Sequence, residues 1–332
     1  MTELDSPALD IVLGQIRDLE NEVRKRIVGM DEEMRLTLIS LYAGGHVLLE
    51  GVPGLAKTLF FKTLAEAANV KFRRISFAAD LLPKDVIGIE HFDTATGKVE
   101  LVVKGPLHTN FLLTDELNRA RTSSKGSVLE PMEEGQVTTE LGGTYRLSPL
   151  FMVIATQNPV EEEGTFGLGR AERDRFLMKV PISYPQATDE KEIIRRFTSA
   201  EKLDAVDHVV DENGILSARA SIKKNVYVDE AVIAKAQKIV DATRPERTSL
   251  STIRSLVEPG GGASPRAGIG IVVAARVNAV MQGRDHVEPD DLISVVTPIL
   301  RHRIVFRPGE VHEEEAESRL NEVIEEIIHQ VM

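Results

Sequence analysis

Short, almost wholly apolar runs alternate with amphipathic segments through the first half of the chain. Such runs are typical of strands that are buried on both faces of a parallel sheet. We predict five strands, over residues 47–50, 72–77, 111–114, 151–156 and 177–182. Between them, apolar positions recur at helical spacing over residues 58–68, 83–87 and 123–134. Strands that alternate with helices predict an α/β fold, in which a parallel sheet is covered by helices.

The remaining patterns predict two hairpins and a helical second half. The hairpins are expected at 92–103, with a turn at 94–97, and at 137–147, with a turn at Gly142-Gly143. The further helices are expected at 8–26, 31–43, 188–203, 229–243, 268–283, 290–301 and 311–331. The run 259–263 is the most linker-like stretch because it is rich in glycine. We predict three parts: an N-terminal helix (1–26), an α/β domain (27–185) and a smaller all-helical domain (186–332).

Composition and charge narrow the class of protein. The 332 residues carry 40 Lys and Arg against 52 Asp and Glu, a net charge of −12. This balance argues against broad electrostatic binding of nucleic acid. The absence of cysteine excludes disulfides and thiolate metal sites. The acidic N-terminus does not resemble a signal peptide and no apolar run is long enough to insert in a membrane, so we expect a cytoplasmic protein.

A glycine-containing turn follows the first predicted strand and precedes a helix. Its residues are Gly51, Val52, Pro53, Gly54, Leu55, Ala56, Lys57 and Thr58. In a P-loop, the backbone N–H groups of such a turn cradle the β- and γ-phosphates, and the helix N-terminus adds partial positive charge. Lys57 would neutralise phosphate oxygens, and the Thr58 hydroxyl would reach Mg²⁺. Ala56 departs from the P-loop pattern, which has a second glycine at that position.

Polar residues follow two of the later strands. Asp115 and Glu116 come after the strand at 111–114, and Asn158 comes shortly after the strand at 151–156. Ligands bind at the carboxyl ends of parallel strands, so Asp115 could hold Mg²⁺ through its water shell and Glu116 could polarise the attacking water. Asn158 could hydrogen-bond the γ-phosphate or orient the water. Taken alone, Asp115 and Glu116 could be a solvated strand end, and Asn158 could belong to an ordinary Asn-Pro turn. The preceding P-loop favours a role of all three residues in the nucleotide site.

Several motifs, in this order and at these separations, closely resemble the MoxR family of AAA+ ATPases. They are Ile27-Val28-Gly29, the segment 43–51, Ala56-Lys57-Thr58, and the segments 115–120, 155–159, 174–178, 262–266 and 300–304. The resemblance covers about residues 27–307. Ala56 is usual in this family, so the departure from the general P-loop pattern supports the resemblance.

The resemblance implies a set of roles. Asp115 and Glu116 would be the Mg²⁺-binding and water-activating acids, and Asn158 the polar sensor on the fourth strand. Val28 and Gly29 would belong to the nucleotide site. Arg266 would be a second sensor that reaches the nucleotide from the helical lid; Ser264 can cap its helix and Pro265 can start it.

One arginine is expected to act across a subunit interface. The resemblance implies Arg175, which would reach the γ-phosphate held by a neighbouring subunit, and an arginine is suited to this because its planar fork stays charged. Arg170 and Arg173 remain alternatives, because Gly167 and Gly169 stand where the family usually has prolines.

The expected function is ATP hydrolysis with Mg²⁺ in an oligomeric ring, most simply a hexamer, that remodels, matures or activates protein partners. The resemblance implies a von Willebrand A-domain protein as the partner. Two alternatives stay open: a nucleic-acid motor of the same AAA+ clade, and a nucleotide-switched scaffold without significant turnover. The acidic composition weighs against the motor, and the presence of Asp115, Glu116 and Asn158 weighs against the scaffold.

Overall fold

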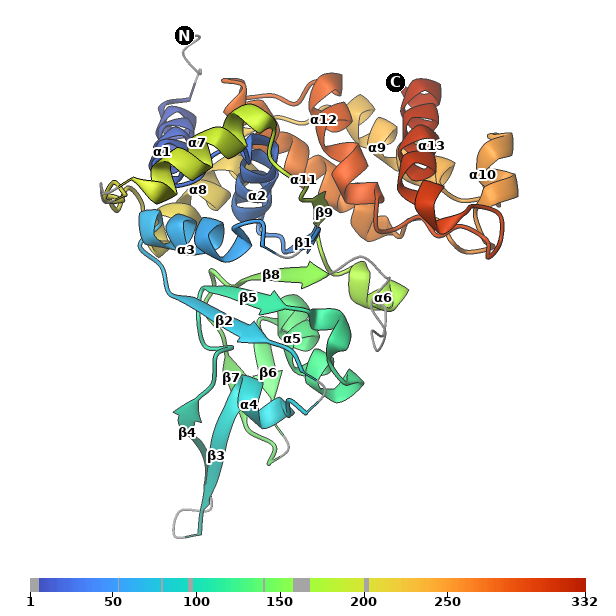
Figure 1. Cartoon of the computed structure of the whole chain (residues 1–332). Helices are drawn as coiled ribbons and strands as arrows, with labels where there is room; N and C mark the ends of the chain where they lie inside the picture. Colours follow the sequence, from blue (N-terminus) through green and yellow to red (C-terminus); the bar gives the residue numbers. More distant parts are fainter. Residues whose placement is uncertain are drawn as a thin grey trace.

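Five strands form one parallel sheet at the centre of the α/β part (Figure 1). The computed structural model describes residues 6–52, 54–78, 80–94, 98–139, 141–157, 168–199 and 203–332. The strands are β1 (Val47–Glu50), β2 (Phe72–Ser76), β5 (Phe111–Asp115), β8 (Met152–Gln157) and β9 (Met178–Pro181). Their order is β2-β5-β8-β1-β9, and every neighbouring pair is parallel. The predicted α/β sheet is confirmed.

Because the strands are parallel, their carboxyl ends lie together on one side of the sheet and their amino ends lie together on the opposite side. β8 lies between β1 and β5, and Glu50 at the end of β1 pairs with Gln157 of β8 and Pro181 of β9. The carboxyl ends of these strands therefore meet at one edge, which we call the carboxyl edge. Their amino ends meet at the opposite edge, the amino edge.

Helices cover both faces of the sheet. They are α1 (Pro7–Arg24), α2 (Asp31–Ala43), α3 (Lys57–Ala67), α4 (Pro83–Ile87), α5 (Thr122–Glu134) and the short α6 (Arg170–Arg173). Successive residues of β1 alternate between the faces: Val47 and Leu49 join the core formed with α1, α2 and α3, and Leu48 joins the core formed with α5. Such alternation follows from the two-residue period of a strand and explains why Val47, Leu48 and Leu49 are all apolar.

Two hairpins extend from the α5 side of the sheet. β3 (Gly88–Asp93) pairs with β4 (Lys98–Lys104) and projects away from the body (Figure 1), and β6 (Gln136–Thr138) pairs with β7 (Thr144–Arg146). The Tyr145 hydroxyl donates a hydrogen bond of 3.1 Å to Glu90, which ties the hairpins together. Both predicted hairpins are confirmed, although residues 95–97 of the first turn lie outside the described residues.

The second half of the described chain is helical, as predicted. Its helices are α7 (Ala187–Thr198), α8 (Glu212–Asn225), α9 (Glu230–Ala242), α10 (Ser251–Leu256), α11 (Pro265–Met281), α12 (Pro289–Leu300) and α13 (Ala316–Val331). The sequence did not predict α8 or α10. α8 has a weak pattern because it buries only Ile215, Ala218 and Ile222 and has a glycine in its first turn, where the Asp211 side chain caps Gly214 N–H. α10 is too short to show periodicity.

The glycine-rich run at 259–263 is a packed turn rather than a flexible linker, so the sequence prediction was wrong here. Gly261, Gly262 and Ala263 are buried. The Thr243 hydroxyl accepts a hydrogen bond of 2.8 Å from Ala263 N–H, and a Cβ on Gly262 would lie 2.6 Å from the Thr243 carbonyl oxygen. Glycine is required because the chain passes close to another backbone segment.

One hydrophobic core runs across both predicted domain boundaries. It includes residues of α1, of β1 and β9, and of the helices that follow β9. The divisions at 26/27 and 185/186 stay predictions. Among the described residues, no helix is both long and apolar enough to cross a membrane.

Candidate active site

The turn in which the sequence predicts a phosphate-binding loop directly follows β1. Gly51 packs against Ile182, the residue after β9, so closely that an added Cβ would lie 2.3 Å from the Ile182 carbonyl oxygen. Gly54 has φ 90° and Ala56 has φ 51°, both in the left-handed region. Ala56 accepts a conformation that costs a non-glycine residue about 1–2 kcal/mol, which explains why the general pattern has glycine there. Pro53 lies outside the described residues.

Lys57 opens α3 and bends back over this loop. Its Nζ donates a hydrogen bond of 2.8 Å to the Gly51 carbonyl oxygen. Burial lowers the pKa of Lys57, and the nearby Asp115 carboxylate opposes that shift. A partly desolvated ammonium at a helix N-terminus, beside backbone N–H groups, is suited to bind an anion such as a phosphate.

The two acids at the end of β5 are held by β8. The Thr156 hydroxyl donates to Asp115 Oδ1 at 3.3 Å and accepts from the Glu116 N–H at 3.1 Å. Glu116 has φ 56°, so the chain turns sharply there and its side chain is redirected from the strand. Asp115 also pairs with Arg74 of β2, and Glu116 with Arg119 at 3.2 Å.

The structure therefore brings the P-loop, Asp115 and Glu116 together at the carboxyl edge. Thr156 and Arg74 are contacts that sequence reasoning missed. Thr156 could have been identified from its position near the carboxyl end of β8, the strand next to β5. Asn158 lies outside the described residues, but Gln157, the residue before it, pairs with Glu50 directly before the P-loop.

The segment that contains Val28 and Gly29 also lies on this side. Gly29 has φ 73°, and a Cβ there would lie 2.9 Å from the Cβ of Asp189 in α7. α7 follows the carboxyl end of β9, so the 28–29 segment belongs to the same edge as the P-loop.

Arg175 and Arg266 lie elsewhere, at the amino edge. Glu133, near the end of α5, pairs with Arg175 at 3.3 Å and also with Arg266. These residues line a pocket of about 320 Å³ together with residues 43–46, which precede β1. The Leu177 N–H donates to the His46 carbonyl oxygen at 2.8 Å, so the segment before β9 lies beside the segment before β1. The P-loop follows the other end of β1, and the structure therefore separates these two arginines from the P-loop of the same chain.

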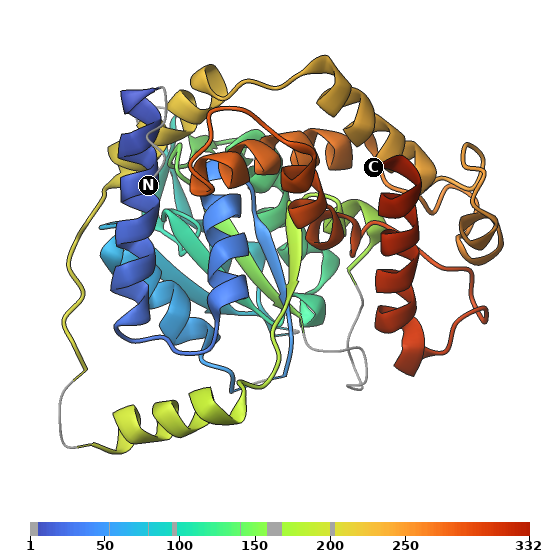
Figure 2. The ribbon, with the colours of Figure 1, turned by 90° about the horizontal axis from the view of Figure 1, so that it is seen from above.

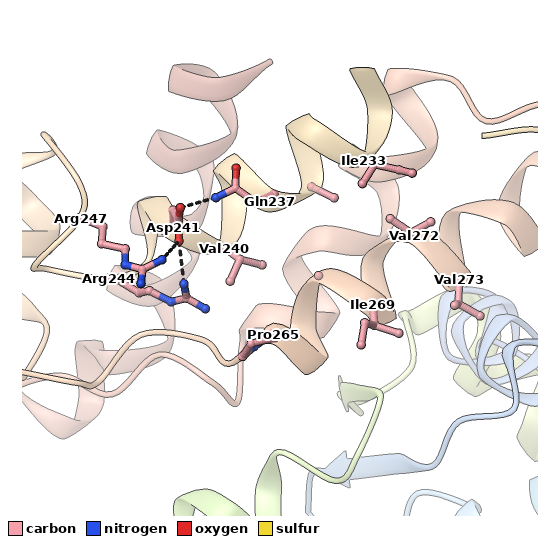
Figure 3. A pocket seen from close by; sticks show the side chains of 12 residues that line it. Ile233, Gln237, Val240, Asp241, Arg244, Arg247, Pro265, Ile269, Val272 and Val273 are labelled. Atoms are coloured by element: carbon pink, nitrogen blue, oxygen red, sulfur yellow. Dashed lines mark hydrogen bonds and ion pairs between the residues drawn. The ribbon is translucent and has the colours of Figure 1, made fainter. Parts of the chain in front are cut away.

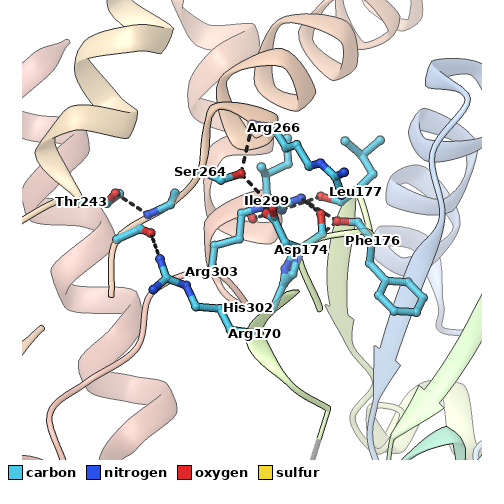
Figure 4. A network of polar contacts seen from close by, with 12 residues as sticks. Arg170, Asp174, Phe176, Leu177, Thr243, Ser264, Arg266, Ile299, His302 and Arg303 are labelled. Carbon is cyan, nitrogen blue, oxygen red and sulfur yellow. Dashed lines mark hydrogen bonds and ion pairs between the residues drawn. The ribbon is translucent and has the colours of Figure 1, made fainter. Parts of the chain in front are cut away.

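A polar network centred on Asp174, the residue before Arg175, reaches Ser264 and the start of α11 (Figure 4). The Arg303 side chain is only 3% exposed; its Nε donates to Asp174 Oδ1 at 2.8 Å, and an Nη donates to the Phe176 carbonyl oxygen at 2.7 Å. Burial lowers the pKa of Arg303, and the Asp174 carboxylate opposes this shift. Asp174 also accepts from the Ser264 hydroxyl at 2.8 Å, and Ser264 accepts from the Arg266 N–H at 3.1 Å. The start of α11 is thereby tied to the residue next to Arg175.

The alternatives to Arg175 have other surroundings. Arg170 contacts the Gly262 carbonyl oxygen, which ties α6 to the packed glycine turn. Burial and the neighbouring Arg170 lower the pKa of the half-buried Arg173. Arg175 lines the amino-edge pocket, whereas Arg170 lines a separate one.

Comparisons with known proteins agree with this geometry. Residues 46–178 match the model of the "ATPase family associated with various cellular activities (AAA)", and residues 260–327 match that of the AAA lid domain. These two matches define an AAA ATPase with its lid.

The relatives specify the family. The chain is 41% identical to Chaperone MoxR1 of Mycobacterium tuberculosis over 294 residues, which cover 86% of this chain and 74% of that protein. It is 31% identical to Protein MoxR of Methylorubrum extorquens over 90% of this chain and 91% of that protein. A crystal structure of a protein from Cytophaga hutchinsonii is 38% identical, with a TM-score of 0.86, over 98% of this chain and 96% of that one. The chain belongs to the MoxR family of AAA+ ATPases and is an ATP hydrolase.

Proposed function

We propose that this ATPase hydrolyses ATP with Mg²⁺ between neighbouring copies of itself in a ring, and uses the energy to remodel protein partners. The observation that supports the proposal most is the division of charged groups between two edges of one sheet. The P-loop, Asp115 and Glu116 lie at the carboxyl edge, and Arg175 and Arg266 lie at the amino edge.

At the carboxyl edge, residues 51–58 would hold the phosphates and Lys57 would neutralise them. Thr58 and Asp115 would hold Mg²⁺; they supply hard oxygen donors, and such sites need only one or two carboxylates because water and phosphate complete the shell. Mg²⁺ would neutralise charge on the phosphates, Glu116 would polarise the attacking water, and Asn158 would orient it.

At the amino edge, Arg175 and Arg266 would serve the nucleotide of a neighbouring copy. Two guanidinium groups share one half-exposed carboxylate, Glu133, so a net positive charge faces the pocket. A γ-phosphate from a neighbour would find two charged donors there. This contact joins different surfaces of the two copies, so it can close into a ring, and the family resemblance suggests six copies.

Protein partners are proposed by analogy with the family. One relative is named a chaperone, and a von Willebrand A-domain protein is the partner that the resemblance implies. We propose a cytoplasmic location. The formal charge of −12 favours protein over nucleic acid as a partner. Titration with single- and double-stranded DNA at low salt should show no binding; tight binding would favour the motor.

Mixing two inactive variants tests the shared site. Arg175→Ala leaves the P-loop intact, and Lys57→Ala leaves Arg175 intact. A mixed ring contains interfaces that pair the intact P-loop of one copy with the intact arginine of another, so ATP turnover should partly return. Oligomers shown to be mixed that stay inactive would contradict a role of Arg175 across the interface.

Co-purification tests the partner. Glu116→Gln is expected to bind ATP and hydrolyse it slowly, so it should retain protein partners that Lys57→Ala releases. Equal recovery of every protein by both variants would contradict ATP-dependent remodelling.

A further inference from the structure

An apolar groove lies between α9 and α11 (Figure 3). It encloses about 460 Å³ and is lined in its apolar part by Ile233, Val240, Ile269, Val272 and Val273. Ile269, which lines this groove, is 66% exposed. A groove with large exposed aliphatic side chains favours a partner with an apolar face.

One end of the groove is positively charged. Asp241 accepts from Arg244 at 2.6 Å and from Arg247 at 3.1 Å, so two guanidinium groups share one carboxylate (Figure 3). This end lies beside Pro265, the first residue of α11. A helix that fitted the groove would therefore need an acidic end followed by an apolar stripe.

α7 has this pattern. None of its twelve residues, all of which the structure describes, is buried. Glu190, Ile194 and Phe197 recur at i, i+4 and i+7 and so share one face of the helix. Ile194 is 57% exposed and Phe197 is 50% exposed. Arg196 anchors α7 to the body through the carbonyl oxygens of Arg24 and Lys25, each at 3.3 Å.

α7 and the groove lie on opposite sides of the molecule. Seen from above, α7 (yellow-green) stands off one side, and α9 (gold) lies toward the other (Figure 2). α7 adjoins the carboxyl edge through Gly29. The groove adjoins the amino-edge pocket, because Ile269 and Val273 line both. A neighbour that presents its P-loop to Arg175 and Arg266 therefore also presents its α7 near the groove.

We propose that α7 of one copy docks into the α9–α11 groove of the next copy. The inference rests on the proposed function, because that function brings the carboxyl edge of one copy to the amino edge of another. Glu190 faces Arg244 and Arg247, Ile194 faces Ile269, and Phe197 fills the end of the groove near Ile233. The acidic first turn of α7 includes Asp189, which adjoins Gly29 at the carboxyl edge. The arginine end of the groove adjoins Pro265, the residue before Arg266, so charge and position agree.

Cross-linking tests the contact directly. The chain has no cysteine, so Ile194→Cys and Ile269→Cys can be combined in one chain without other reactive thiols. With Mg·ATP and a short bis-maleimide, each copy should link to the next and give a ladder of oligomers. The matched control combines Ile194→Cys with Ile11→Cys, since Ile11 is 64% exposed on α1. Oligomers that give no more ladder than this control would overturn the proposal.

Mixing of charge variants tests the head-to-tail geometry. Ile194→Asp and Ile269→Asp should each raise the protein concentration needed for half-assembly at least about tenfold, because each places an unpaired carboxylate in the contact. Ile11→Asp should leave it unchanged. In an equimolar mixture, the intact α7 of one variant meets the intact groove of the other, so dimers should form without larger rings. Normal assembly of Ile269→Asp, as expected if α7 paired with α7, would overturn the proposal.

These readouts do not depend on turnover. Cross-linked oligomers that release no phosphate would contradict the proposed function and leave the docking intact. Phosphate release by oligomers that fail to cross-link would overturn the docking alone.

Discussion

Acidification should destabilise the fold through the imidazole of His46. This residue precedes β1; its Nδ1 accepts from the Val153 N–H at 3.0 Å, so its Nε2 carries the proton and donates to the Met132 carbonyl oxygen at 3.0 Å. Burial lowers the pKa of His46 to about 4, and the hydrogen bond to Met132 only partly opposes this. Protonation would put a charge in the buried layer and break the bond to Val153.

The size of the effect follows from proton linkage. The pKa of His46 is about 4 in the folded protein against the ordinary value of 6.5. Between these values the unfolded chain binds more protons, so the stabilisation is present above the unfolded pKa and is lost as pH falls toward the folded pKa. Lowering the pH from 7 to about 5 should therefore cost about 2 kcal/mol of unfolding free energy from this residue. Burial lowers the pKa of His302 as well, so the wild-type protein should lose more than this.

Urea unfolding at the two pH values, followed by circular dichroism, isolates the contribution of His46. His46→Asn keeps an oxygen that can accept from Val153 but cannot be protonated in this range. The variant should lose about 2 kcal/mol less than the wild type on acidification. His91→Asn is the matched control, because His91 is exposed in β3. An equal loss in the wild type and His46→Asn would refute the reasoning.

Two further predictions concern the P-loop. Lys57→Ala should abolish ATP binding in calorimetry, because the phosphates would lose their main neutralising charge; unchanged affinity would contradict the P-loop assignment. Gly51→Ala should destabilise the protein by about 1–3 kcal/mol in thermal unfolding, because its Cβ would lie 2.3 Å from the Ile182 carbonyl oxygen. The control Gly126→Ala, in an open helical position of α5, should stabilise by up to about 1 kcal/mol, and equal effects of both variants would contradict the packing argument.

The sequence predicted the centre of the sheet well because β1, β5 and β8 are buried on both faces. All six residues of β8 are buried, and its first four, Met152–Ala155, form a continuous apolar run. The P-loop and the acids after β5 were found for a related reason: each directly follows such a run, and local chemistry then indicates its ligand. The helical part was harder, because α8 buries few residues and its first turn resembles a loop.

Long-range placement could not be predicted. Arg266 was expected to reach a nucleotide from the lid. No local sequence pattern indicates whether that nucleotide is bound by the same copy or by a neighbouring one. The answer depends on Arg303, Ser264 and Asp174, which join α11 and the chain after α12 to the segment before β9. The prediction of a linker at 259–263 was wrong for the same reason. Both close backbone packing and flexibility favour glycine, and only tertiary contacts distinguish the two.

Steady-state phosphate release by the wild type and Glu116→Gln tests the central claim most directly. The amide keeps the shape of Glu116 but cannot polarise water as a carboxylate does, so turnover should fall at least about a hundredfold. ATP affinity, measured on the same preparations, should stay unchanged. Near-normal turnover by Glu116→Gln would contradict the account, and the catalytic role would then have to lie elsewhere, first of all at Asp115.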